Sequence, residues 1–278
     1  DDGTYYCFPF FRGESYENNS LLFSEGPVYR MDILKSLGFE NPPETAEEFY
    51  EVLVAIKNAG VVEIPFSIRA EHINRMLAPA FDSWDTWYVE DGQVKHGYLD
   101  DNRYDYLAFV NKLYKEGLLD NDYMSVNKNG MNSMFLSGRV AVAYNPGSLI
   151  GNAVATMPDA EISSAKPLSS VKGQNSKFAK MNTVFDTGAA SAAAITTSCK
   201  NIEAAARLLD YAYGEEGHLL ANFGIEGVTY EMIDGYPTYT DFVNANKADQ
   251  LTRDTRANAN GAFVQDPRYT DQYYDVEE

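Results

Sequence analysis

Cysteines, basic residues and long apolar runs are all scarce in this 278-residue chain. Two cysteines, Cys7 and Cys199, are too few for a disulfide framework, and we expect two free, mostly buried thiols. No apolar run reaches the roughly eighteen residues that a membrane-spanning helix needs. The first residues also lack the basic and apolar regions of a signal peptide, so we expect none within this chain, as in a mature or trimmed product.

The shortage of basic residues gives the chain a strong negative charge. Lys and Arg number 22 against 41 Asp and Glu, a formal net charge of −19. Such a charge repels phosphate backbones and anionic lipid, which argues against nucleic acid and membrane surfaces as partners. A solvated acidic surface that keeps the protein soluble accounts for the charge without any electrostatic role. The 45% of hydrophobic residues suffice for the core of one large domain or two modest ones.

Two helices are predicted early in the chain. Thr45-Ala-Glu-Glu48 forms a capping box, and the apolar residues after it keep helical spacing until Gly60. Pro27 stands where a first helical turn would begin, and an apolar stripe follows it up to Gly38, which predicts a short helix between the two.

Strands and further helices alternate through the middle of the chain. β-favouring residues predict strands over 2–11, buried on at least one face, and over 61–68 and 140–144. Asp91-Gly92 predicts the turn of a hairpin over 88–98. Helical patterns cover 72–81, 101–117 and a short segment ending at 137. This alternation predicts an α/β fold.

The C-terminal half is less regular. Residues 158–180 are rich in Ser, Lys and Gly and predict a long surface connection, whereas 183–197 are small and apolar and predict a tightly packed strand. From Asn201 a strongly amphipathic helix runs to glycines and a turn over 223–230. The polar tail from Thr252 is expected to be mobile.

Five segments resemble one family in the expected order. They are Val28-Tyr-Arg-Met-Asp, the Thr45-capped helix, Phe135-Leu-Ser-Gly-Arg-Val-Ala-Val142, the amphipathic helix after Asn201, and Phe223-Gly-Ile-Glu-Gly-Val-Thr-Tyr230. Over residues 1 to 240 the chain resembles the extracellular solute-binding proteins of ABC importers, family 1, in the branch that binds sugars and oligosaccharides. Each motif alone is weak, and their order and spacing carry the resemblance.

The resemblance implies a periplasmic-binding-protein-like α/β fold of type II, with two lobes joined by crossing strands around a ligand cleft. By this resemblance residues 1–10 are a hinge strand, 11–182 a nearly complete second lobe, 183–240 a return into the first lobe, and 241–278 a polar tail. Most of the N-terminal lobe would then be lacking. The resemblance also implies a location outside the cell or in the periplasm, with a lipid anchor on the full-length precursor.

A sugar site needs aromatic faces for stacking and fixed polar groups for hydroxyls. We expect it on strand-end loops, at Arg12, Glu14, Arg69, Glu71, His72, Asn74, Trp84, Trp87, Tyr144 and Asn145. The alternative for the two tryptophans is a role as core anchors, because their spacing of three fits a buried helix face. Glu226 and Tyr230 belong to the family's signature, but a structural role is at least as plausible for them.

Catalytic and metal motifs are not found in the sequence. His72, His96 and His218 lack ligand spacing, so we expect no metal and no cofactor. The expected function is binding of a carbohydrate, an oligosaccharide in particular, for delivery to the transmembrane subunits of an ABC transporter. Two alternatives stay open. One is a glycoside-cleaving enzyme that uses Asp82 and Asp85, and the other is a receptor lobe that self-associates through its incomplete first lobe.

Overall fold

The computed structural model describes residues 3–13, 15, 25–146, 148–178, 184–186, 192–245, 263–268 and 272. The chain divides into two compact units. The central unit is residues 25–180, and the discontinuous unit joins residues 1–24 to residues 181–278.

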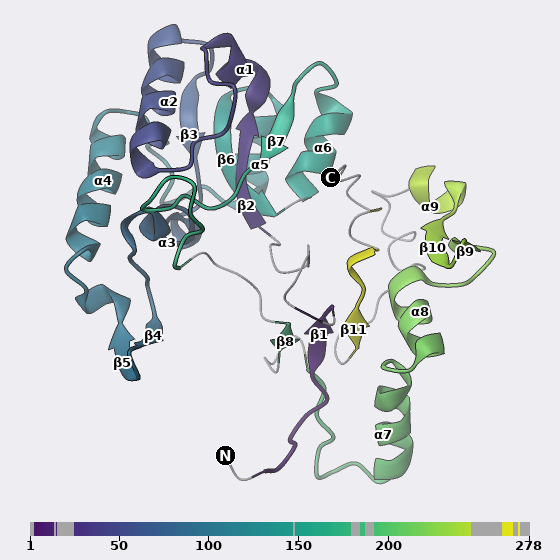
Figure 1. Ribbon diagram of the computed structural model, residues 1–278. Helices are drawn as coiled ribbons and strands as arrows, with labels where there is room; N and C mark the ends of the chain where they lie inside the picture. Colours follow the sequence, from purple (N-terminus) through teal and green to yellow (C-terminus); the bar gives the residue numbers. More distant parts are fainter. Residues whose placement is uncertain are drawn as a thin grey trace. The chain divides into compact units, whose positions relative to one another are not determined.

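A four-stranded sheet forms the middle of the central unit (Figure 1). Its order is β3-β6-β2-β7, where β6 runs parallel to β3 and β2 runs antiparallel to both β6 and β7. The strands are β2 (Glu25–Arg30), β3 (Ile64–Ser67), β6 (Val140–Pro146) and β7 (Ile162–Ser164). The mixture of this sheet with helices confirms the predicted α/β class.

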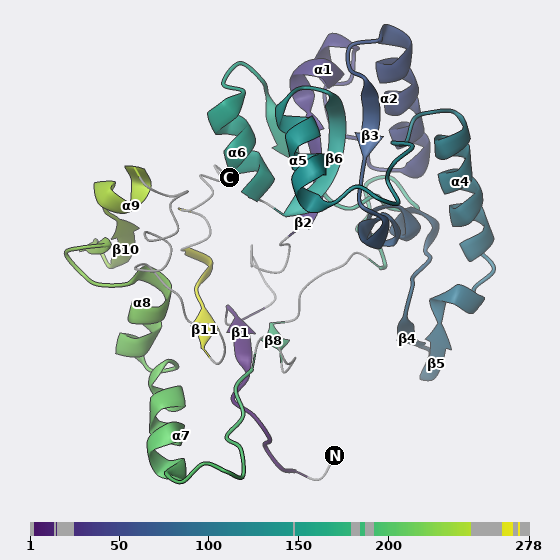
Figure 2. The same cartoon turned by 180° about the vertical axis from the view of Figure 1, so that it is seen from behind.

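Helices cover both faces of this sheet. Figure 1 and Figure 2 show α1 (Met31–Ser36) and α2 (Ala46–Ala59) on one face, and α5 (Lys128–Leu136) and α6 (Ser148–Thr156) on the other. Consecutive residues of β2 point to opposite faces of the sheet. Tyr29 belongs to the larger apolar cluster with α1 and α2, and Val28 belongs to the smaller cluster with α5 and α6. This alternation follows from the pleat of a strand and fixes the register of the sheet.

The helix predicted after Thr45 is confirmed. The hydroxyl oxygen of Thr45 accepts the backbone N–H of Glu48 at 3.3 Å, and the helix ends at Gly60 in the left-handed region with φ of 62°. Phe49, Val52, Leu53 and Ile56, the apolar residues at helical spacing, are its buried residues.

The predicted start of the first helix at Pro27 is wrong. Pro27 lies inside β2 opposite Tyr144, and α1 begins only at Met31. Strand pairing prevails here because Val28 and Tyr29 are needed in the two apolar layers. The pairing of β7 with β2 begins at Val28, one residue after Pro27, so the missing N–H of the proline interrupts no bond to β7.

A compact group of short elements follows β3. It comprises the 3₁₀ turn η2 (Ala70–His72), α3 (Ile73–Leu77) and the 3₁₀ turn η3 (Ala78–Phe81), where a helix over 72–81 was predicted. The predicted hairpin is confirmed as β4 (Trp87–Glu90) and β5 (Gln93–His96), with Asp91 and Gly92 both at positive φ, as a type I′ turn requires. The predicted next helix is α4 (Arg103–Lys115).

The predictions for two segments need correction. The segment 158–180 is more than a surface connection, because β7 joins the sheet and Leu168 and Ser169 are buried. The described residues of the segment 2–11 form a strand only at the end of the segment, where β1 (Phe10–Arg12) begins, apart from an isolated bridge between Phe8 and Ala193. Pro9, which lacks an N–H, precedes β1.

The discontinuous unit holds a three-stranded sheet of order β11-β1-β8. Here β11 (Val264–Gln265) runs parallel to β1, and β8 (Phe185–Asp186) runs antiparallel to it. Within the predicted strand 183–197, the described residues contribute only β8 and the bridge at Ala193. Phe185 is exposed, so the tightly packed strand is not found in the described part.

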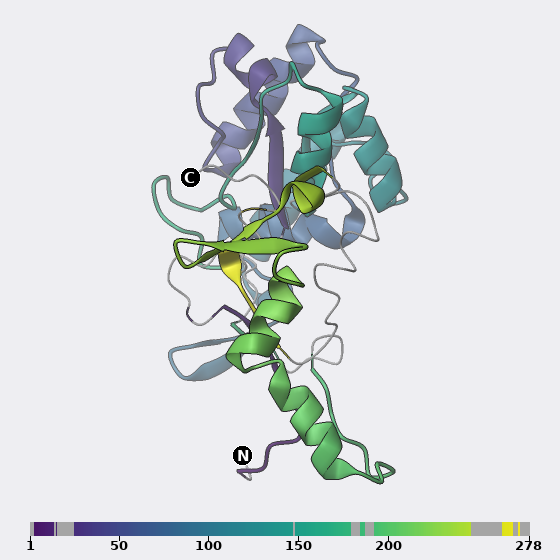
Figure 3. The same ribbon diagram turned by 90° about the vertical axis from the view of Figure 1, so that its right-hand side faces the viewer.

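Three helices and a hairpin also belong to the described part of the discontinuous unit (Figure 3). They are α7 (Ile202–Tyr211), α8 (Glu215–Phe223), the hairpin β9 (Tyr230–Ile233) and β10 (Tyr236–Tyr239), and α9 (Asp241–Ala245). The amphipathic helix after Asn201 ends at Tyr211, and α8 is a separate helix. Gly217 permits this close turn, because a Cβ there would lie 1.9 Å from the carbonyl oxygen of Tyr211.

The apolar core described in this unit is small. Phe223, Tyr230, Tyr239 and Val243 form one buried cluster, whereas α7 buries none of its residues despite its amphipathic sequence.

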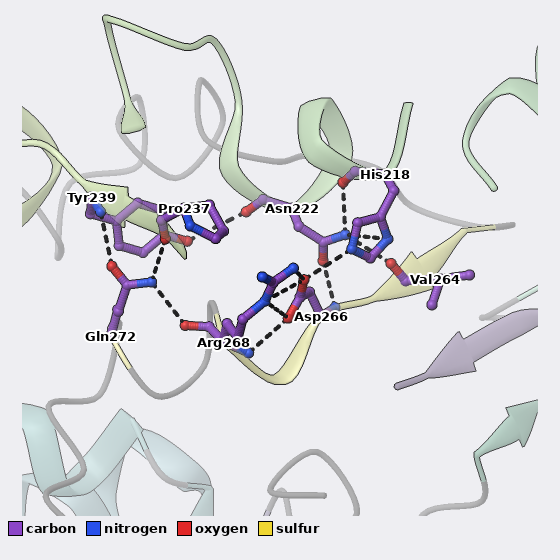
Figure 4. Close-up of polar contacts among 8 residues, drawn as sticks. All are labelled: His218, Asn222, Pro237, Tyr239, Val264, Asp266, Arg268 and Gln272. Atoms are coloured by element: carbon purple, nitrogen blue, oxygen red, sulfur yellow. Dashed lines mark hydrogen bonds and ion pairs between the residues drawn. The ribbon is translucent and has the colours of Figure 1, made fainter. Parts of the chain in front are cut away.

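A polar network ties the strand β11 to α8 (Figure 4). Asp266 is 5% exposed and accepts from His218 at 3.0 Å and from Arg268 at 2.6 Å. The amide of Asn222 donates to the carbonyl of Val264 at 2.8 Å and accepts the backbone N–H of Asp266 at 2.8 Å. Burial alone raises the pKa of Asp266, but the bonds from His218 and Arg268 outweigh it and hold the pKa well below its usual value.

No described helix is long and apolar enough to cross a membrane. Cys7 and Cys199 are free, as predicted, but half-buried rather than mostly buried. The polar tail predicted to be mobile from Thr252 lies largely outside the described residues.

Candidate functional site

Three strand ends meet at one edge of the central sheet. Glu25 starts β2 opposite Pro146, the last residue of β6, and Ser67 ends β3 opposite Ala143 of β6. Because β2 runs antiparallel to β6 and β3 runs parallel to it, the start of β2 and the ends of β3 and β6 share this edge. The chain that leaves β3 turns directly into η2 and α3, which brings polar side chains to the same edge.

Glu25 is the central acceptor at this edge. Its carboxylate accepts from the guanidinium of Arg75 at 2.7 Å and lies 3.5 Å from Nε2 of His72. The Glu25 side chain is only 12% exposed, so the Arg75 guanidinium offsets much of the cost of taking this carboxylate out of water. Removal of either partner would leave a charge partly buried and uncompensated.

His72 is held on several sides by rings and charges. Its imidazole packs edge-on against Tyr144, with ring centroids 5.4 Å apart, and lies 3.0 Å from the guanidinium of Arg69. Burial lowers the pKa of His72. Arg69 and Arg75 lower it further, and the opposing carboxylates of Glu25 and Glu71 do not offset these effects. The Glu25 contact is therefore one to a neutral ring near pH 7.

Arg69 completes this group. It forms an ion pair with Glu71 at 2.5 Å, and burial of Tyr144 beside the group raises the pKa of that phenol. We call Glu25, Arg69, His72, Arg75 and Tyr144 the strand-end cluster. Its polar atoms include carboxylate acceptors, guanidinium donors and one neutral imidazole, next to an aromatic ring.

A second polar network surrounds Asn74 of α3. Oδ1 of Asn74 accepts from the hydroxyl of Tyr106 at 2.7 Å and from Arg103 at 3.2 Å, and its amide donates to Asp85 at 3.4 Å. The guanidinium of Arg103 lies over the rings of both Tyr98 and Tyr106, 4.6 Å from each centroid. Asn74 and Arg75 are consecutive, so α3 joins this network to the strand-end cluster.

The structure brings together five of the ten predicted ligand residues. Arg69, Glu71, His72 and Tyr144 meet in or beside the strand-end cluster, and Asn74 lies one residue from Arg75. Asn145 pairs with Gly26 in β6 at the same sheet edge.

The other predicted residues lie elsewhere or are not described. Arg12 belongs to β1 of the discontinuous unit, where its guanidinium lies 4.9 Å from the ring centroid of Phe10. Glu14 lies outside the described residues. A ligand role for any of the ten stays a prediction.

The helix face proposed for the tryptophans is wrong. Trp84 lies in an irregular segment and stacks on Phe178 with ring centroids 5.9 Å apart. Trp87 opens β4 and is 66% exposed, so it is no core anchor. The two indoles therefore have different environments, one half-buried and one open to solvent.

Sequence reasoning missed three contributors to these networks. Glu25 is the first residue of β2, and a charged residue at a strand end was a usable signal. Arg103 and Tyr106 lie within a predicted helix, and no local pattern pairs them with Asn74.

The discontinuous unit carries a separate open cavity of about 550 Å³ beside α7 and α8. Carboxylates, phenols and aliphatic side chains line it: Tyr211, Glu215, Glu216, Leu219, Leu220, Gly224, Ile225, Glu226 and Tyr230. The buried hydroxyl of Thr229 fixes the turn above it by accepting the N–H of Ile225 at 2.7 Å and donating to Phe223 at 2.6 Å. Tyr230 is buried in the local core, which favours the structural role for this signature.

No described cluster of His, Cys, Asp and Glu has the composition to hold a metal ion. The two networks of the central unit supply hydrogen-bond donors, acceptors and aromatic faces in fixed positions. Such groups suit recognition of a polar small molecule.

Comparison with known proteins identifies the family. The profile of the bacterial extracellular solute-binding proteins matches residues 17–218, more than half of the chain. Lipoprotein LipO of Bacillus subtilis (strain 168) is 27% identical over 244 residues, which cover 80% of this chain and 46% of the relative.

Solved structures show the same fold. The alginate-binding protein AlgQ2, without calcium ion, superposes with a TM-score of 0.73 at 24% identity, over 98% of this chain and 57% of its own. A solute-binding protein of Bifidobacterium longum infantis ATCC 15697, described as binding HMO and associated with an ABC transporter, superposes with a TM-score of 0.67 at 18% identity, over 97% and 59%. This chain thus spans about half the length of the curated relative and under two thirds of these structures. With a periplasmic-binding-protein-like α/β fold and a matching profile, the chain belongs to the family of bacterial extracellular solute-binding proteins.

Proposed function

We propose that this chain binds a carbohydrate outside the cytoplasm and that the whole protein delivers it to the transmembrane subunits of an ABC transporter. The family supports solute binding rather than catalysis. Similar folds include proteins described in complex with kestose and as binding HMO, which favours a sugar as the solute. The likeness to lipoprotein LipO supports a lipid-anchored, extracytoplasmic precursor.

The strand-end cluster is the observation that carries the proposal. Sugar hydroxyls both donate and accept hydrogen bonds, and the cluster presents both kinds of partner beside the ring of Tyr144. Together with the neighbouring Glu71 its charges balance, because Arg75 pairs with Glu25 and Arg69 pairs with Glu71. A neutral polyhydroxylated ligand fits such a balanced group better than an ion of either sign.

We further propose an oligosaccharide. The strand-end cluster and the Asn74 network adjoin at the consecutive residues Asn74 and Arg75 of α3, which favours a ligand of more than one sugar ring. In this proposal the central unit corresponds to the second lobe predicted for residues 11–182. The discontinuous unit corresponds to the hinge strand 1–10 and the return segment 183–240.

The test is binding to the full chain. Calorimetry and thermal shift are measured with the neutral tetrasaccharides maltotetraose, stachyose, nystose and lacto-N-tetraose, and with an alginate tetramer. We expect binding of at least one neutral member and its loss in Glu25→Gln and in Arg75→Met. Absence of binding to every sugar would overturn the proposal.

A matched control separates ligand contact from a general charge effect. Glu63 forms an ion pair with Arg139 at 2.6 Å at the start of β3, and both side chains are largely exposed. Glu63→Gln removes the same charge at the other end of the strand, so it should leave binding unchanged. Equal losses in Glu63→Gln and Glu25→Gln would show that the strand-end cluster is not the site.

The two other functions stay predictions without a specific observation in their favour. Glycoside cleavage would need Asp82 and Asp85 as acid and base. Asp85 accepts a hydrogen bond from Asn74, and the backbone of Asp82, which follows η3, is in the left-handed region. Neither feature indicates acid–base catalysis. Release of nitrophenol from an aryl glycoside that vanishes in Asp82→Asn would promote that function. Sedimentation of the chain at high concentration tests self-association.

A further inference from the structure

The β4–β5 hairpin carries a row of aromatic rings on its exposed face. Trp87 and His96 lie opposite each other in the hairpin register, and their rings meet edge-on with centroids 4.7 Å apart. The ring of Tyr98 follows, 5.2 Å from that of His96. We call Trp87, His96 and Tyr98 the hairpin strip. Trp87 and Tyr98 are exposed by 66% and 54%.

The opposite face of the hairpin anchors it to the central unit. Tyr88 packs edge-on against Phe178 at 4.9 Å and donates its hydroxyl hydrogen to Asp100 at 2.9 Å. Glu90 forms ion pairs with Lys95 and Lys177. The strip is therefore held in place before any ligand arrives, which lowers the entropy lost on binding.

The end of the strip is fixed as well. Gly97 is buried, and a Cβ at this position would lie 2.3 Å from the carbonyl oxygen of Trp84, so the backbone approach needs glycine. The backbone N–H of Tyr98 donates to Nδ1 of His96 at 3.3 Å, which ties the imidazole to the turn that follows the hairpin.

The strip connects to the strand-end cluster through named contacts. The Tyr98 ring lies under the guanidinium of Arg103, and Arg103 donates to Asn74. Asn74 precedes Arg75, the partner of Glu25. All these residues belong to the central unit, so this chain of contacts lies within one compact unit.

We propose that the hairpin strip is a stacking subsite for a further sugar ring of the oligosaccharide bound at the strand-end cluster. The proposal rests on the proposed carbohydrate function. Indole, imidazole and phenol rings offer an apolar face to the C–H surface of a pyranose and a polar atom to its hydroxyls. A strip of three residues is small against the roughly 800 Å² that each partner buries in a stable protein interface.

Chain-length dependence tests this subsite. For the best-bound tetrasaccharide of the panel, Trp87→Ala should weaken binding about five- to tenfold, whereas binding of the matched disaccharide should change less than about twofold. Trp87→Phe keeps a ring and should retain most of the affinity. Val89→Ala removes an exposed apolar side chain from the same strand and should change neither ligand's affinity.

Fluorescence gives a second readout because the chain has only two tryptophans. In Trp84→Phe the emission comes from Trp87 alone, and saturation with the tetrasaccharide should shift it to shorter wavelength. Unchanged tetrasaccharide binding in Trp87→Ala, alongside a loss in Glu25→Gln, would overturn the subsite and leave the proposed function intact. Binding of no sugar to the unmodified chain would overturn both.

Discussion

The two compact units differ in what holds them together. In the central unit, apolar layers pack on both faces of one sheet, and Tyr29, Phe49 and Phe66 are fully buried. In the described part of the discontinuous unit, the buried apolar cluster has only four residues, and a buried carboxylate ties β11 to α8. Apolar burial is the main source of folding free energy, so we expect the central unit to be the more stable of the two.

Removal of a core ring from the central unit should have the largest effect. Phe66 is fully buried on β3 and packs edge-on against Phe49 at 5.2 Å. Phe66→Ala should lower the free energy of unfolding by about 3–5 kcal/mol, because it leaves a cavity in the larger cluster. Both tryptophans lie in the central unit, so urea unfolding followed by tryptophan fluorescence reports this unit.

The control is Val61→Ala, which truncates a 49% exposed side chain just before β3. Its fluorescence midpoint should stay within error of the unmodified chain. If Phe66→Ala also left the midpoint unchanged, apolar burial would not be what sets the central unit apart.

Asp266→Asn should have the second largest effect, confined to the discontinuous unit. The substitution keeps the shape of the side chain but removes the charge that His218 and Arg268 face. We expect a loss of about 2–3 kcal/mol, below the roughly 3–5 kcal/mol of a fully buried pair because Arg268 is 39% exposed. Far-UV circular dichroism should show an earlier loss of helix while the tryptophan transition stays in place.

Acid should destabilise the discontinuous unit more in the unmodified chain than in Asp266→Asn. The folded pKa of Asp266 lies below the unfolded value of about 3.9, so its stabilisation is present above that pH and is lost as pH falls toward the folded pKa. Asp266→Asn should remove this part of the acid sensitivity. Glu231→Gln, at an exposed position of β9, should not. The same acid sensitivity in Asp266→Asn would show that other groups cause it.

The elements that sequence predicts correctly are those whose signals are local. The hydroxyl cap of Thr45, the apolar period after it and the left-handed Gly60 lie within one helix, and Asp91-Gly92 specifies a hairpin turn by itself. The helix expected from Pro27 failed because the sheet, assembled from distant segments, required Val28 and Tyr29 as strand residues.

The site was predictable only in part for the same reason. Arg69, Glu71 and His72 follow a strand directly, and a strand-end loop is a local signal. The partner of Arg75 is Glu25, fifty residues earlier in the chain, and only the sheet register brings the two together. The spacing of Trp84 and Trp87 indicated a helix, but the close approach of Gly97 to Trp84 places them at the base of a hairpin.

Helix caps offer a matched comparison with a smaller expected effect. Thr45 caps α2 by accepting from Glu48, and Asn201 caps α7 by accepting from Ala204 at 3.1 Å. Replacement of either by Ala should cost about 1 kcal/mol of local stability. Because α2 has four buried residues and α7 has none, we expect Thr45→Ala to affect only the first turn, and Asn201→Ala the whole of α7. Hydrogen exchange of the backbone amides measures how far along each helix the protection is lost. Loss of protection over the same number of turns in both helices would contradict this expectation.

The smallest effect should come from the ion pair on the surface of α7. Glu203 accepts from Arg207 one turn later at 2.7 Å, with side chains 75% and 79% exposed. The acid precedes the base, which is the favourable order, but water screens the pair. Glu203→Ala should therefore cost about 0.3–0.5 kcal/mol. Because α7 has no buried anchor, the loss should appear as faster amide exchange within α7 and should vanish in concentrated salt. A loss that persists in salt would mean that Glu203 stabilises α7 through something other than its charge.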